Sequence, residues 1–569
     1  MSLRRSAVAL CAAAATSLSL IVPAHAQVVD QPIVHSAPGA ALTLAPVGSY
    51  ETGVFDESAA EIVAYHAATQ RVLTVNANSG QIDVLDIADP TAPSKVGSVD
   101  AGEGTVINSV AVRADGLAVA TVERADDKTA PGALLFFNAE TLDHLGAVQV
   151  GSLPDMVTIT EDGAHALVAN EAEPAEDYSV DPEGSVSIVA LPDEVAAATQ
   201  NDVRTADFRA YNEPGALPEG VRIFGQVGAS ETVAQNLEPE YITVQGGTAY
   251  VSLQENNALA VVDIASATVT DILPLGTVDH SVVPLDASDR DDKINITTWP
   301  VKGFLMPDAI ESYQVGGTNY IVTANEGDAR DWDAYSEEAR VKHLGDEDEG
   351  LSPICADFNG MTAEEIADLQ EDENLGRLKI TTANGYDAEN DCYSELYSYG
   401  GRGFSIVDGS GNRVFNSDAQ FEEILAEAIP EYFNSNHDEA GFDGRSDDKG
   451  PEPEGVALGE IDGRTYAFIG LERIGGVMVY DVTNPAAAQF VTYVNNRDFS
   501  VSMEDEADQE AALRKAGDLG PEGLPFIPAA DSPNEKNLLV VGNEVSGTTT
   551  IFQIDEVLAQ PGLSSLSSR

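Results

Sequence analysis

Carboxylates recur at two points of a repeated sequence unit, and this pattern could gather them into a cation site. The stretch LPDMVTITEDGAHALVANEAEP, residues 153–174, contains a Pro-acid pair, two apolar runs and an Asn-Glu pair. Its clearest relatives carry the first acid at Asp155, Glu240, Asp308, Glu454 and Glu522, and the second at Glu171, Glu255, Glu326, Glu472 and Glu544. Two looser copies place Glu61 at the first point, and Asn108 and Glu123 at the first and second points.

These units are built like the blades of a β-propeller. Short β-branched runs are bounded by turn pairs such as Asp115-Gly116 and Asp162-Gly163, which is typical of antiparallel hairpins. Seven copies predict an all-β, seven-bladed β-propeller over residues 41–556. The last copy lacks an outer strand, so we expect ALTLAPVGSY, residues 41–50, to complete it and close the ring.

Blade geometry explains why the acids should converge. The first strand of a blade leaves one face of the ring and the second strand returns to it, so both acids should lie at one mouth of the central channel. Two carboxylates about 5 Å apart repel by roughly 3 kcal/mol at an effective dielectric near 20. Cations, arginines, backbone N–H donors or protonation must offset this repulsion. The alternative is that each carboxylate accepts backbone N–H bonds within its own turn.

The pattern therefore predicts a site for divalent cations. Hard oxygen ligands suit Ca²⁺, with Mg²⁺ as the alternative. The predicted ligands are Asp155, Glu171, Glu240, Asp308, Glu326, Asp328, Glu454, Glu472, Glu522 and Glu544.

Basic residues are scarce in this chain, yet several lie close to these acids in the later copies. Arg330, Arg402, Arg445 and His437 are the candidate catalytic residues, because a cation together with arginine is what a phosphate ester would need. The alternative is salt bridges inside the ring. We expect salt bridges more for Arg330 and Arg473, which follow the second acid, than for Arg402 and Arg445.

The insertions differ in composition from the blades. Helical patterns are confined to them: residues 361–370 with Thr362 and Glu365 as a capping box, residues 417–428 with Ser417 and Gln420, and a third segment that ends at Gly517. An insertion at 326–403 in blade five contains Cys355 and Cys392, which should pair in an oxidising compartment. The sequence leaves open whether this insertion is a lid. LDASDRDDKINI, residues 285–296, resembles a calcium loop without its Gly and terminal Glu, and we expect a solvated turn.

Charge and the N-terminus indicate the compartment and exclude two classes of partner. The net charge is −66, which repels nucleic acid and anionic membranes. Residues 1–26 have two arginines, an apolar stretch and Ala24-His25-Ala26, typical of a signal peptide cleaved between Ala26 and Gln27. Beyond this segment, no apolar run reaches the ~18 residues of a membrane span. We therefore expect a periplasmic or secreted protein without a membrane span.

Several stretches resemble the choice-of-anchor I family, which is related to mesenchyme-specific cell-surface glycoproteins. They include PVKGFLMPDAI, TANEGDAR, RSDDKGPEPEGV, LERIGGVMVYDV and LGPEGLPFIP, and the resemblance extends over about residues 42–555. It implies a secreted or surface β-propeller. Bacterial members are often labelled alkaline phosphatases and the animal relatives are associated with mineralised tissue, and both associations fit calcium and phosphate. The family's varied C-terminal anchors have no counterpart in the final residues QPGLSSLSSR.

Three functions follow from these observations. The first is a propeller that binds Ca²⁺ and an anionic ligand or surface component at its acidic channel mouth. The second is a metal-dependent phosphomonoesterase that uses the same face. The third is an adhesion module, which would not need convergent arginines.

Overall fold

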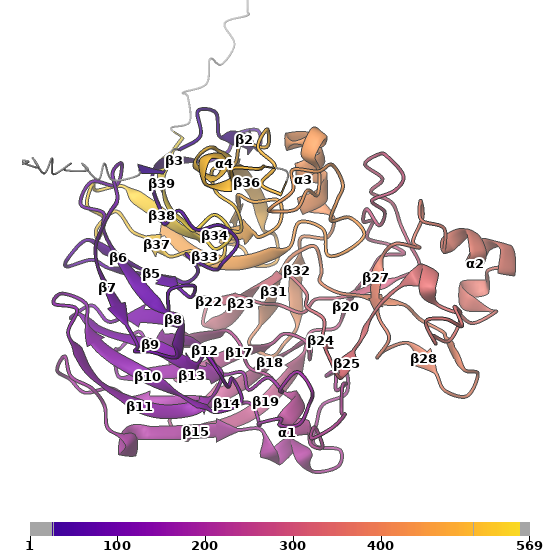
Figure 1. Cartoon of the computed structure of the whole chain (residues 1–569), viewed down its shortest axis with the longest axis horizontal. Coiled ribbons are helices and arrows are strands. Elements are labelled where there is room, and N and C mark those ends of the chain that lie inside the picture. Colours follow the sequence, from indigo (N-terminus) through magenta and orange to yellow (C-terminus); the bar gives the residue numbers. More distant parts are fainter. Residues whose placement is uncertain (1–24, 27, 505, 558–569) are drawn as a thin grey trace, which may run out of the picture.

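Seven antiparallel sheets, each with four or five strands, form a ring in the part of the chain that the structure describes (Figure 1). The computed structural model describes residues 25–26, 28–504 and 506–557, so most of the predicted signal peptide lies outside the described residues. The innermost strands contact one another in chain order, and β38 contacts β4, which closes the ring. The predicted all-β propeller fold is thereby confirmed.

Four sheets follow one another in the N-terminal half. They are β4 (Val63–His66), β5 (Arg71–Asn76), β6 (Gln81–Asp86) and β7 (Ser94–Asp100); β8 (Thr105–Val112), β9 (Leu117–Arg124), β10 (Pro131–Asn138) and β11 (His144–Ser152); β12 (Pro154–Ile159), β13 (His165–Asn170), β14 (Ser185–Ala190) and β15 (Val203–Asp207); and β16 (Ile242–Gln245), β17 (Thr248–Leu253), β18 (Ala258–Asp263) and β19 (Thr268–Pro274). The second strands are buried almost throughout, because neighbouring sheets pack face to face.

Three sheets complete the ring. They are β22 (Ile310–Val315), β23 (Thr318–Asn325), β31 (Gly403–Asp408) and β32 (Arg413–Asn416); β33 (Pro453–Ile461), β34 (Arg464–Leu471), β35 (Val477–Asp481) and β36 (Gln489–Asn495), with β2 (Ile33–Ser36) at the outer edge; and β37 (Phe526–Ile527), β38 (Asn537–Asn543) and β39 (Thr548–Glu556), extended by β3 (Leu42–Glu51) and β1 (His25–Ala26). The N-terminal strand β3 pairs with β39 from Leu42–Glu556 to Glu51–Thr548. The first and last parts of the chain therefore share one sheet.

Inner strands approach one another very closely where the acids begin. A Cβ atom added to Gly455 on β33 would lie 1.9 Å from the backbone oxygen of Glu522, so glycine is needed there. This approach places the chain around Glu454 beside the chain around Glu522. The close packing of inner strands is what brings acids from different sheets together.

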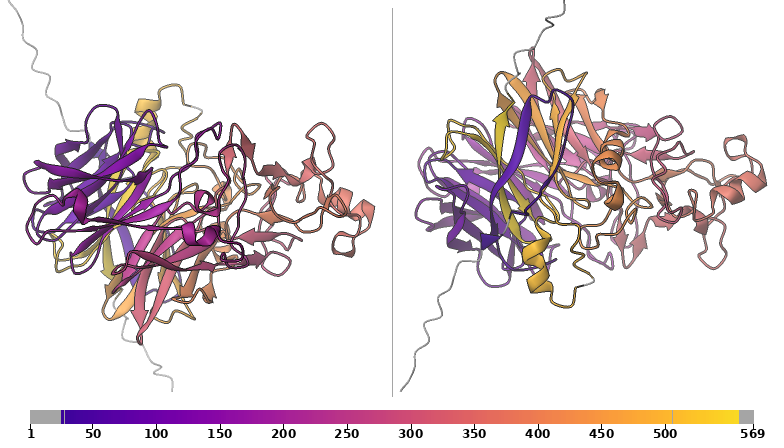
Figure 2. Two further views of the ribbon diagram at one scale, coloured as in Figure 1. Left: turned by 90° about the horizontal axis from the view of Figure 1, so that it is seen from below. Right: turned by 90° about the horizontal axis from the view of Figure 1, so that it is seen from above.

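A side lobe, residues 326–402, is inserted between β23 and β31 and projects outward from the ring (Figures 1 and 2). It contains α2 (Ala363–Leu369), and its short strands are β24 (Asp331–Trp332), β25 (Tyr335–Ser336), β26 (Glu338–Arg340), β27 (Lys379–Thr381), β28 (Tyr386–Asp387), β29 (Cys392–Tyr393) and β30 (Tyr397–Ser398). β30 joins β20 (Thr277–Asp279) and β21 (Lys302–Phe304), which lie in the chain between the fourth and fifth sheets of the ring, in a separate three-stranded sheet. The hydrophobic core of the lobe includes Phe358, Leu375 and Ile380 and is shared with Leu285, Ala287 and Val301 from the chain before β21. Cys355 is bonded to Cys392.

The remaining helices are α1 (Val233–Asn236), α3 (Gln420–Ala428) and α4 (Gln509–Ala516). The capping box of Thr362 and Glu365 is confirmed, as is the end of α4 at Gly517. The predicted box of Ser417 and Gln420 is wrong: α3 begins at Gln420, and the Ser417 hydroxyl instead accepts a bond from the Phe404 N–H. Among the described residues, no helix is both long and apolar enough to cross a bilayer.

The loop of residues 285–296 is not the solvated turn that its charges predicted. The side chain of Asp286 is completely buried, and Asp289 accepts two bonds from Arg377 of the side lobe. The surrounding loops, which lie far away in the sequence, cover it.

The closing strand β3 should be essential for stability. Leu44 on β3 is 3% exposed and packs in a cluster with Val479 and Phe552. We expect Leu44→Ala to lower the free energy of unfolding by about 2–5 kcal/mol, because it leaves a cavity between two sheets. The midpoint of urea unfolding, followed by circular dichroism, measures this. Thr43→Ala, on the exposed face of the same strand, should change stability by less than about 0.5 kcal/mol. Equal losses in both variants would contradict the role of Leu44 in closure.

Candidate functional site

The acids of the repeat converge on one cavity near the axis of the ring. Its volume is about 460 Å³. Its lining includes the predicted ligands Asp155, Glu171, Glu240, Asp308, Asp328, Glu454 and Glu522, together with Glu61, Glu123 and Glu255. We call this space the axial cavity. The predicted ligands Glu326, Glu472 and Glu544, the second acids of the last three units, are not among its lining residues.

Beyond the acids, the lining of the channel becomes mainly apolar. A second cavity of about 370 Å³ shares Ile62, Ser109, Met156, Tyr241 and Glu522 with the axial cavity. Apart from Glu311 and Glu522, it is lined mainly by apolar residues of the inner strands. Burial and the nearby carboxylate of Asp308 raise the pKa of Tyr241 well above its ordinary value, so its hydroxyl stays protonated. The negative charge is therefore concentrated in one part of the channel.

Within and beside the axial cavity the acids form groups of three. In each group, one possible ligand atom from every member lies within 4.8 Å of the others. The groups are Glu61, Glu522 and Glu544; Glu171, Glu240 and Glu255; Asp308, Glu326 and Glu454; Glu326, Glu452 and Glu472; and His437, Glu472 and Glu544. Predicted ligands from different sheets thus meet at spacings that a single cation could bridge.

Many of these carboxylate oxygens have no donor to offset their charge. The Oε2 atoms of Glu123, Glu240, Glu255, Glu454 and Glu522 are buried and have no hydrogen-bond partner among the described residues. Isolated buried charges are costly unless they are paired or coordinate a metal. The alternative that every acid serves to cap its own turn does not account for these oxygens.

The crowding shifts the acids towards protonation. Burial, and then the charge of Glu544, raise the pKa of Glu61 from its ordinary value of 4.5 to about 8. Burial, followed by the charge of Glu173, raises the pKa of Asp155 to about 7. Glu171, Glu240 and Glu454 shift in the same direction, with burial as the largest cause and neighbouring carboxylates as the next. Without cations, Glu61 and Asp155 are therefore partly neutral near pH 7.

One acid is an exception, because three basic residues surround it. Glu452 is completely buried and accepts charge-assisted contacts from Arg445 at 2.5 Å, Lys449 at 3.1 Å and Arg473 at 3.1 Å. Burial acts to raise its pKa, but the three cations together hold it well below its usual range. We call this group the basic hub.

The basic hub is directly connected to the acid groups. Lys449 Nζ also lies 2.9 Å from Glu326 Oε1, and Arg473 lies 2.9 Å from Glu472 Oε1. His437 Nδ1 is 3.4 Å from Glu472 and its ring contacts the Arg473 guanidinium. Cationic and anionic side chains therefore meet at the edge of the axial cavity.

The predicted catalytic arginines have protein partners. Arg330 is 2% exposed and pairs with Glu238, and its guanidinium packs over the Phe224 ring. Arg402 donates to the Glu422 carboxylate at 2.6 Å and to three backbone oxygens. The expected difference in salt bridging between Arg330 and Arg402 is not found: both are in buried ion pairs, and the loops before β21 and after α3 enclose Arg402. A phosphate-binding role for these arginines stays a prediction.

Sequence reasoning missed several residues of the site. Glu452, one residue before Pro453, anchors the basic hub, while the sequence pattern pointed only to Glu454 after it. Glu173 lines the axial cavity and pairs with Lys128 at 2.9 Å, and Gln254 donates to Glu326. The signal was the additional acid in each of these stretches, the first acid of PEPE (Glu452) and the second acid of NEAEP (Glu173), which the strict two-point pattern did not include.

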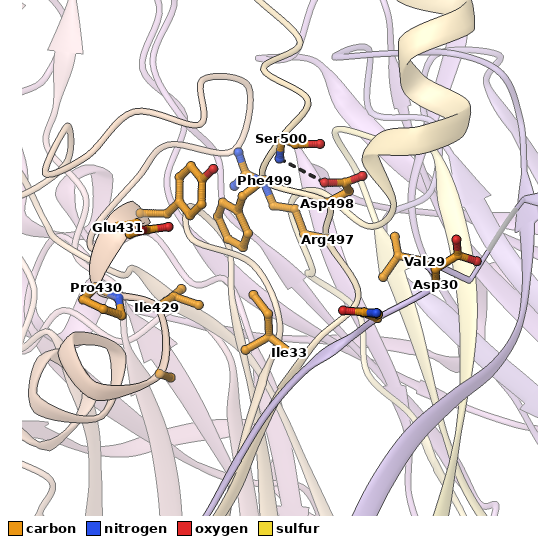
Figure 3. A pocket seen from close by; sticks show the side chains of 13 residues that line it. Val29, Asp30, Ile33, Ile429, Pro430, Glu431, Arg497, Asp498, Phe499 and Ser500 are labelled. Atoms are coloured by element: carbon orange, nitrogen blue, oxygen red, sulfur yellow. Dashed lines mark hydrogen bonds between the residues drawn. The ribbon is translucent and has the colours of Figure 1, made fainter.

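A larger cavity lies elsewhere. It has about 640 Å³ and lies between the N-terminal segment, the end of α3 and residues 497–500 (Figure 3). It shares no lining residue with the axial cavity, and its buried cation, Arg497, packs against the Phe499 ring at 4.5 Å. Its size alone does not connect it with the acids.

The ring and its site define a class: a β-propeller whose axial cavity is lined by carboxylates and bordered by a basic hub. The choice-of-anchor I domain matches residues 61–485 of the chain. The protein belongs to the choice-of-anchor I family.

Two relatives and two solved structures show how far this similarity extends. Gigasin-3a of Magallana gigas is 30% identical over 210 residues, 35% of this chain and 72% of the relative. The mesenchyme-specific cell surface glycoprotein of Strongylocentrotus purpuratus is 32% identical over 319 residues, 49% of this chain and 40% of that protein, so the match spans less than half of the sea-urchin protein.

Among solved structures, Kuenenia stuttgartiensis hydrazine synthase aligns with a TM-score of 0.41 at 12% identity, covering 88% of this chain and 98% of that one. The WD40 domain of Toxoplasma gondii coronin gives 0.40 at 8% identity, covering 93% and 90%. Similarities at this level indicate no function.

Stability should depend on pH in a direction set by the raised pKa values. Between about pH 4.5 and 8, the folded metal-free protein binds more protons than the unfolded chain, because the pKa of Glu61 rises from 4.5 to about 8 on folding. Stability therefore falls as pH rises through this window. We expect the melting temperature in EDTA to be lower at pH 8 than at pH 5.5. A rise in the melting temperature over the same interval would contradict the raised pKa values.

Two acids on either side of Pro453 should respond oppositely to neutralisation. Glu452→Gln leaves three cations without their common partner, and we expect a loss of about 3–5 kcal/mol. Glu454→Gln removes one of several repelling charges, so at pH 8 in EDTA it should stabilise the protein. Urea unfolding of both variants beside the wild type measures the difference. If both substitutions destabilise the protein equally, the proposed division between basic hub and acid groups fails.

Proposed function

We propose that this protein is an extracytoplasmic binding protein that holds divalent cations, best Ca²⁺, in the axial cavity and binds an anionic ligand or surface component there. The observation that carries the proposal is the set of buried, unpartnered carboxylate oxygens within groups whose ligand atoms lie within 4.8 Å of one another. Cations are the remaining means of offsetting this charge when the acids are ionised.

The chemistry of the donors favours Ca²⁺ over other metals. Four of the five groups contain only carboxylates, and the fifth adds His437. Ca²⁺ accepts six to eight oxygen ligands in flexible geometry, whereas Mg²⁺ requires a near-ideal octahedron and retains several waters. Acids contributed by different sheets give many oxygens in an irregular arrangement, which matches the less demanding ion.

An anionic ligand is supported by the border of the cavity. A cation held by the acid groups would present positive charge to the cavity, and Lys449 and Arg473 of the basic hub lie beside Glu326 and Glu472. Together they would attract a phosphate, sulfate or carboxylate group. One similar protein is by its name a cell surface glycoprotein, which supports a ligand on a cell surface or in its surroundings.

Calcium binding should be visible as stabilisation of the native state. We expect Ca²⁺ added to chelator-treated protein to raise the melting temperature, because an ion bound only to the folded state stabilises it by about 2.7 kcal/mol at 100 times its dissociation constant. The gain should be larger at pH 8 than at pH 5.5, where protons compete for the carboxylates. Glu240→Gln combined with Glu454→Gln should weaken it. An unchanged melting temperature at millimolar Ca²⁺ at either pH would refute the cation site.

A metal-dependent phosphomonoesterase is the second candidate. The observation that favours it is the group of His437, Glu472 and Glu544 next to Arg473, which combines metal ligands with a cation for a phosphate. In this version Glu326, Asp328, Glu454, Glu472, Glu522 and Glu544 would hold the metal, and Arg330, Arg402 and Arg445 were the predicted phosphate ligands. A bound divalent ion would supply Lewis-acid chemistry. Because the four terminal bonds of Arg402 go to protein groups, Arg473 and Lys449 are better placed at the cavity edge.

Hydrolysis of p-nitrophenyl phosphate separates the two candidates. If the protein is a phosphatase, activity with Ca²⁺ should fall by at least an order of magnitude in His437→Ala, while Thr43→Ala on β3 stays active. Absence of turnover with Ca²⁺, Mg²⁺, Mn²⁺ or Zn²⁺ from acid to alkaline pH would remove this candidate and leave the binding function.

A further inference from the structure

A second buried acidic cluster lies outside the axial cavity, where three segments of the chain meet. Asp286 comes from the loop before β21, Glu422 from α3, and Asn434 and Asp443 from the loop after α3. Their exposed fractions are 0%, 1%, 0% and 2%, and none of them lines the axial cavity. Together with the nearby Asp291, we call these residues the junction cluster.

Hydrogen bonds connect the members of the cluster. The Asn434 side-chain N–H donates to Glu422 at 3.1 Å and to the Ser446 hydroxyl at 2.9 Å. Ser446 in turn donates to Asp443 Oδ1 at 2.5 Å. The Glu422 carboxylate also accepts a bond from the Asp286 backbone N–H at 3.1 Å. One polar network thus connects α3, the loop after it and the backbone of the loop before β21.

This network leaves two ligand-type oxygens without partners. Asp443 Oδ2 and Asn434 Oδ1 are buried and accept no hydrogen bond from any described residue, although both side chains contact the same Ser446 hydroxyl through their other atoms. A buried carboxylate oxygen and a buried amide oxygen are both groups that lose free energy when left unpaired. Side-chain amide and carboxylate oxygens are the ligands that Ca²⁺ prefers.

The charges of the cluster do not balance. Glu422 pairs with Arg402 at 2.6 Å, and Asp291 pairs with Lys293 at 3.3 Å. Asp286 and Asp443 have no ion-pair partner among the described residues; Asp286 accepts backbone N–H bonds from Asn295 and Ser288.

Two further arginines near the junction cluster form ion pairs with acids outside it. Arg377 forms ion pairs with Asp289 and Asp447, and Arg340 forms one with Asp447. Burial raises the pKa of Asp443 to about 8, and the charges of Asp286, Asp291 and Glu422 act on it in the same direction. Two buried carboxylates thus remain to be neutralised.

From these contacts we infer that the junction cluster is a second, structural site for a divalent cation, with Ca²⁺ as the fitting ion. Asp443 Oδ2 and Asn434 Oδ1 are its protein ligands, and Asp286 supplies the second uncompensated charge. One divalent ion would neutralise the two carboxylates that have no ion-pair partner.

The position of the site indicates that a bound cation would help to hold the side lobe on the ring. Arg377 of the side lobe reaches Asp289 at 2.8 Å on one side and Asp447 at 2.8 Å on the other, so the lobe is attached to the same two loops that form the junction cluster. A cation that holds these loops together would fix the side lobe to the ring. Loss of the ion should therefore loosen residues 326–402, which hydrogen exchange followed by mass spectrometry would detect as faster exchange.

Terbium luminescence can separate this site from the axial cavity, because the chain has two tryptophans and they lie near different sites. Trp332 packs on Lys128 at 3.7 Å, and Lys128 pairs with Glu173 of the axial cavity. Trp299 lies two residues after Thr297, whose backbone pairs with Leu285 next to Asp286. In Trp332→Phe protein, Tb³⁺ emission excited through tryptophan therefore reports on the junction cluster.

We expect Trp332→Phe protein to show saturable emission that Ca²⁺ displaces. In this background Asp443→Asn should weaken Tb³⁺ binding by at least about tenfold, as the loss of a metal-coordinating group does. The control is Asp292→Asn, an exposed acid of the loop that carries Asp286 and Asp291, whose left-handed backbone (φ 57°) asparagine tolerates. Glu240→Gln with Glu454→Gln should leave this emission unchanged, so a failed axial site and a failed junction site give different results.

Either of two outcomes would overturn the inference. One is no tryptophan-sensitised emission from Trp332→Phe protein up to millimolar Tb³⁺, a measurement that requires no change in the cluster itself. The other is indistinguishable titrations of Asp443→Asn and Asp292→Asn. If Asp443→Asn does not fold, Asn434→Ala, which keeps every carboxylate, should weaken binding in its place, and an unchanged affinity would equally contradict the site.

Discussion

Repulsion between carboxylates in a confined space is the constraint on which the rest of this structure depends. Acids from different sheets lie within bridging distance of one another around the axial cavity, and several of their oxygens are buried without a donor. The protein meets this cost in two ways. Around Glu452 it supplies Arg445, Lys449 and Arg473, and elsewhere it leaves the charge for protons or cations. Glu452 illustrates the first arrangement and Glu454 the second, although only Pro453 lies between them in the sequence.

The ring is what creates the crowding. Each inner strand carries its acid towards the axis, and close approach of strands at Gly455 leaves the acids no room to separate. Pairing of β3 with β39 closes the ring and ties both ends of the described chain into one sheet. The closed ring holds the acids in place even though they repel, so a cation bound between them would relieve this repulsion.

The same physical situation recurs at the junction cluster, on a smaller scale and with a different purpose. Glu422 has Arg402 as its counter-ion, while Asp443 is buried without one. The axial acids border an open cavity, whereas the junction residues are enclosed between loops and α3. A cation in the axial cavity would remain accessible to a ligand, but one in the junction cluster would serve only to hold segments together. The side lobe, which contains a disulfide and shares its hydrophobic core with the chain before β21, is attached to the ring close to this cluster.

The sequence by itself determined the repeat, the propeller fold, the strand that completes the last sheet and the convergence of the two sets of acids. These follow from local patterns: alternating apolar runs, turn residues, and acids at fixed places in each unit. The tertiary structure alone decided which charges are compensated. Arg330 and Arg402 are in ion pairs with Glu238 and Glu422, residues that no motif links to them. Asp286 reads as a solvated turn residue and is buried, because loops from distant parts of the chain cover it. Charge compensation depends on contacts between residues that are far apart in the sequence, and local sequence patterns do not predict which segments will be in contact.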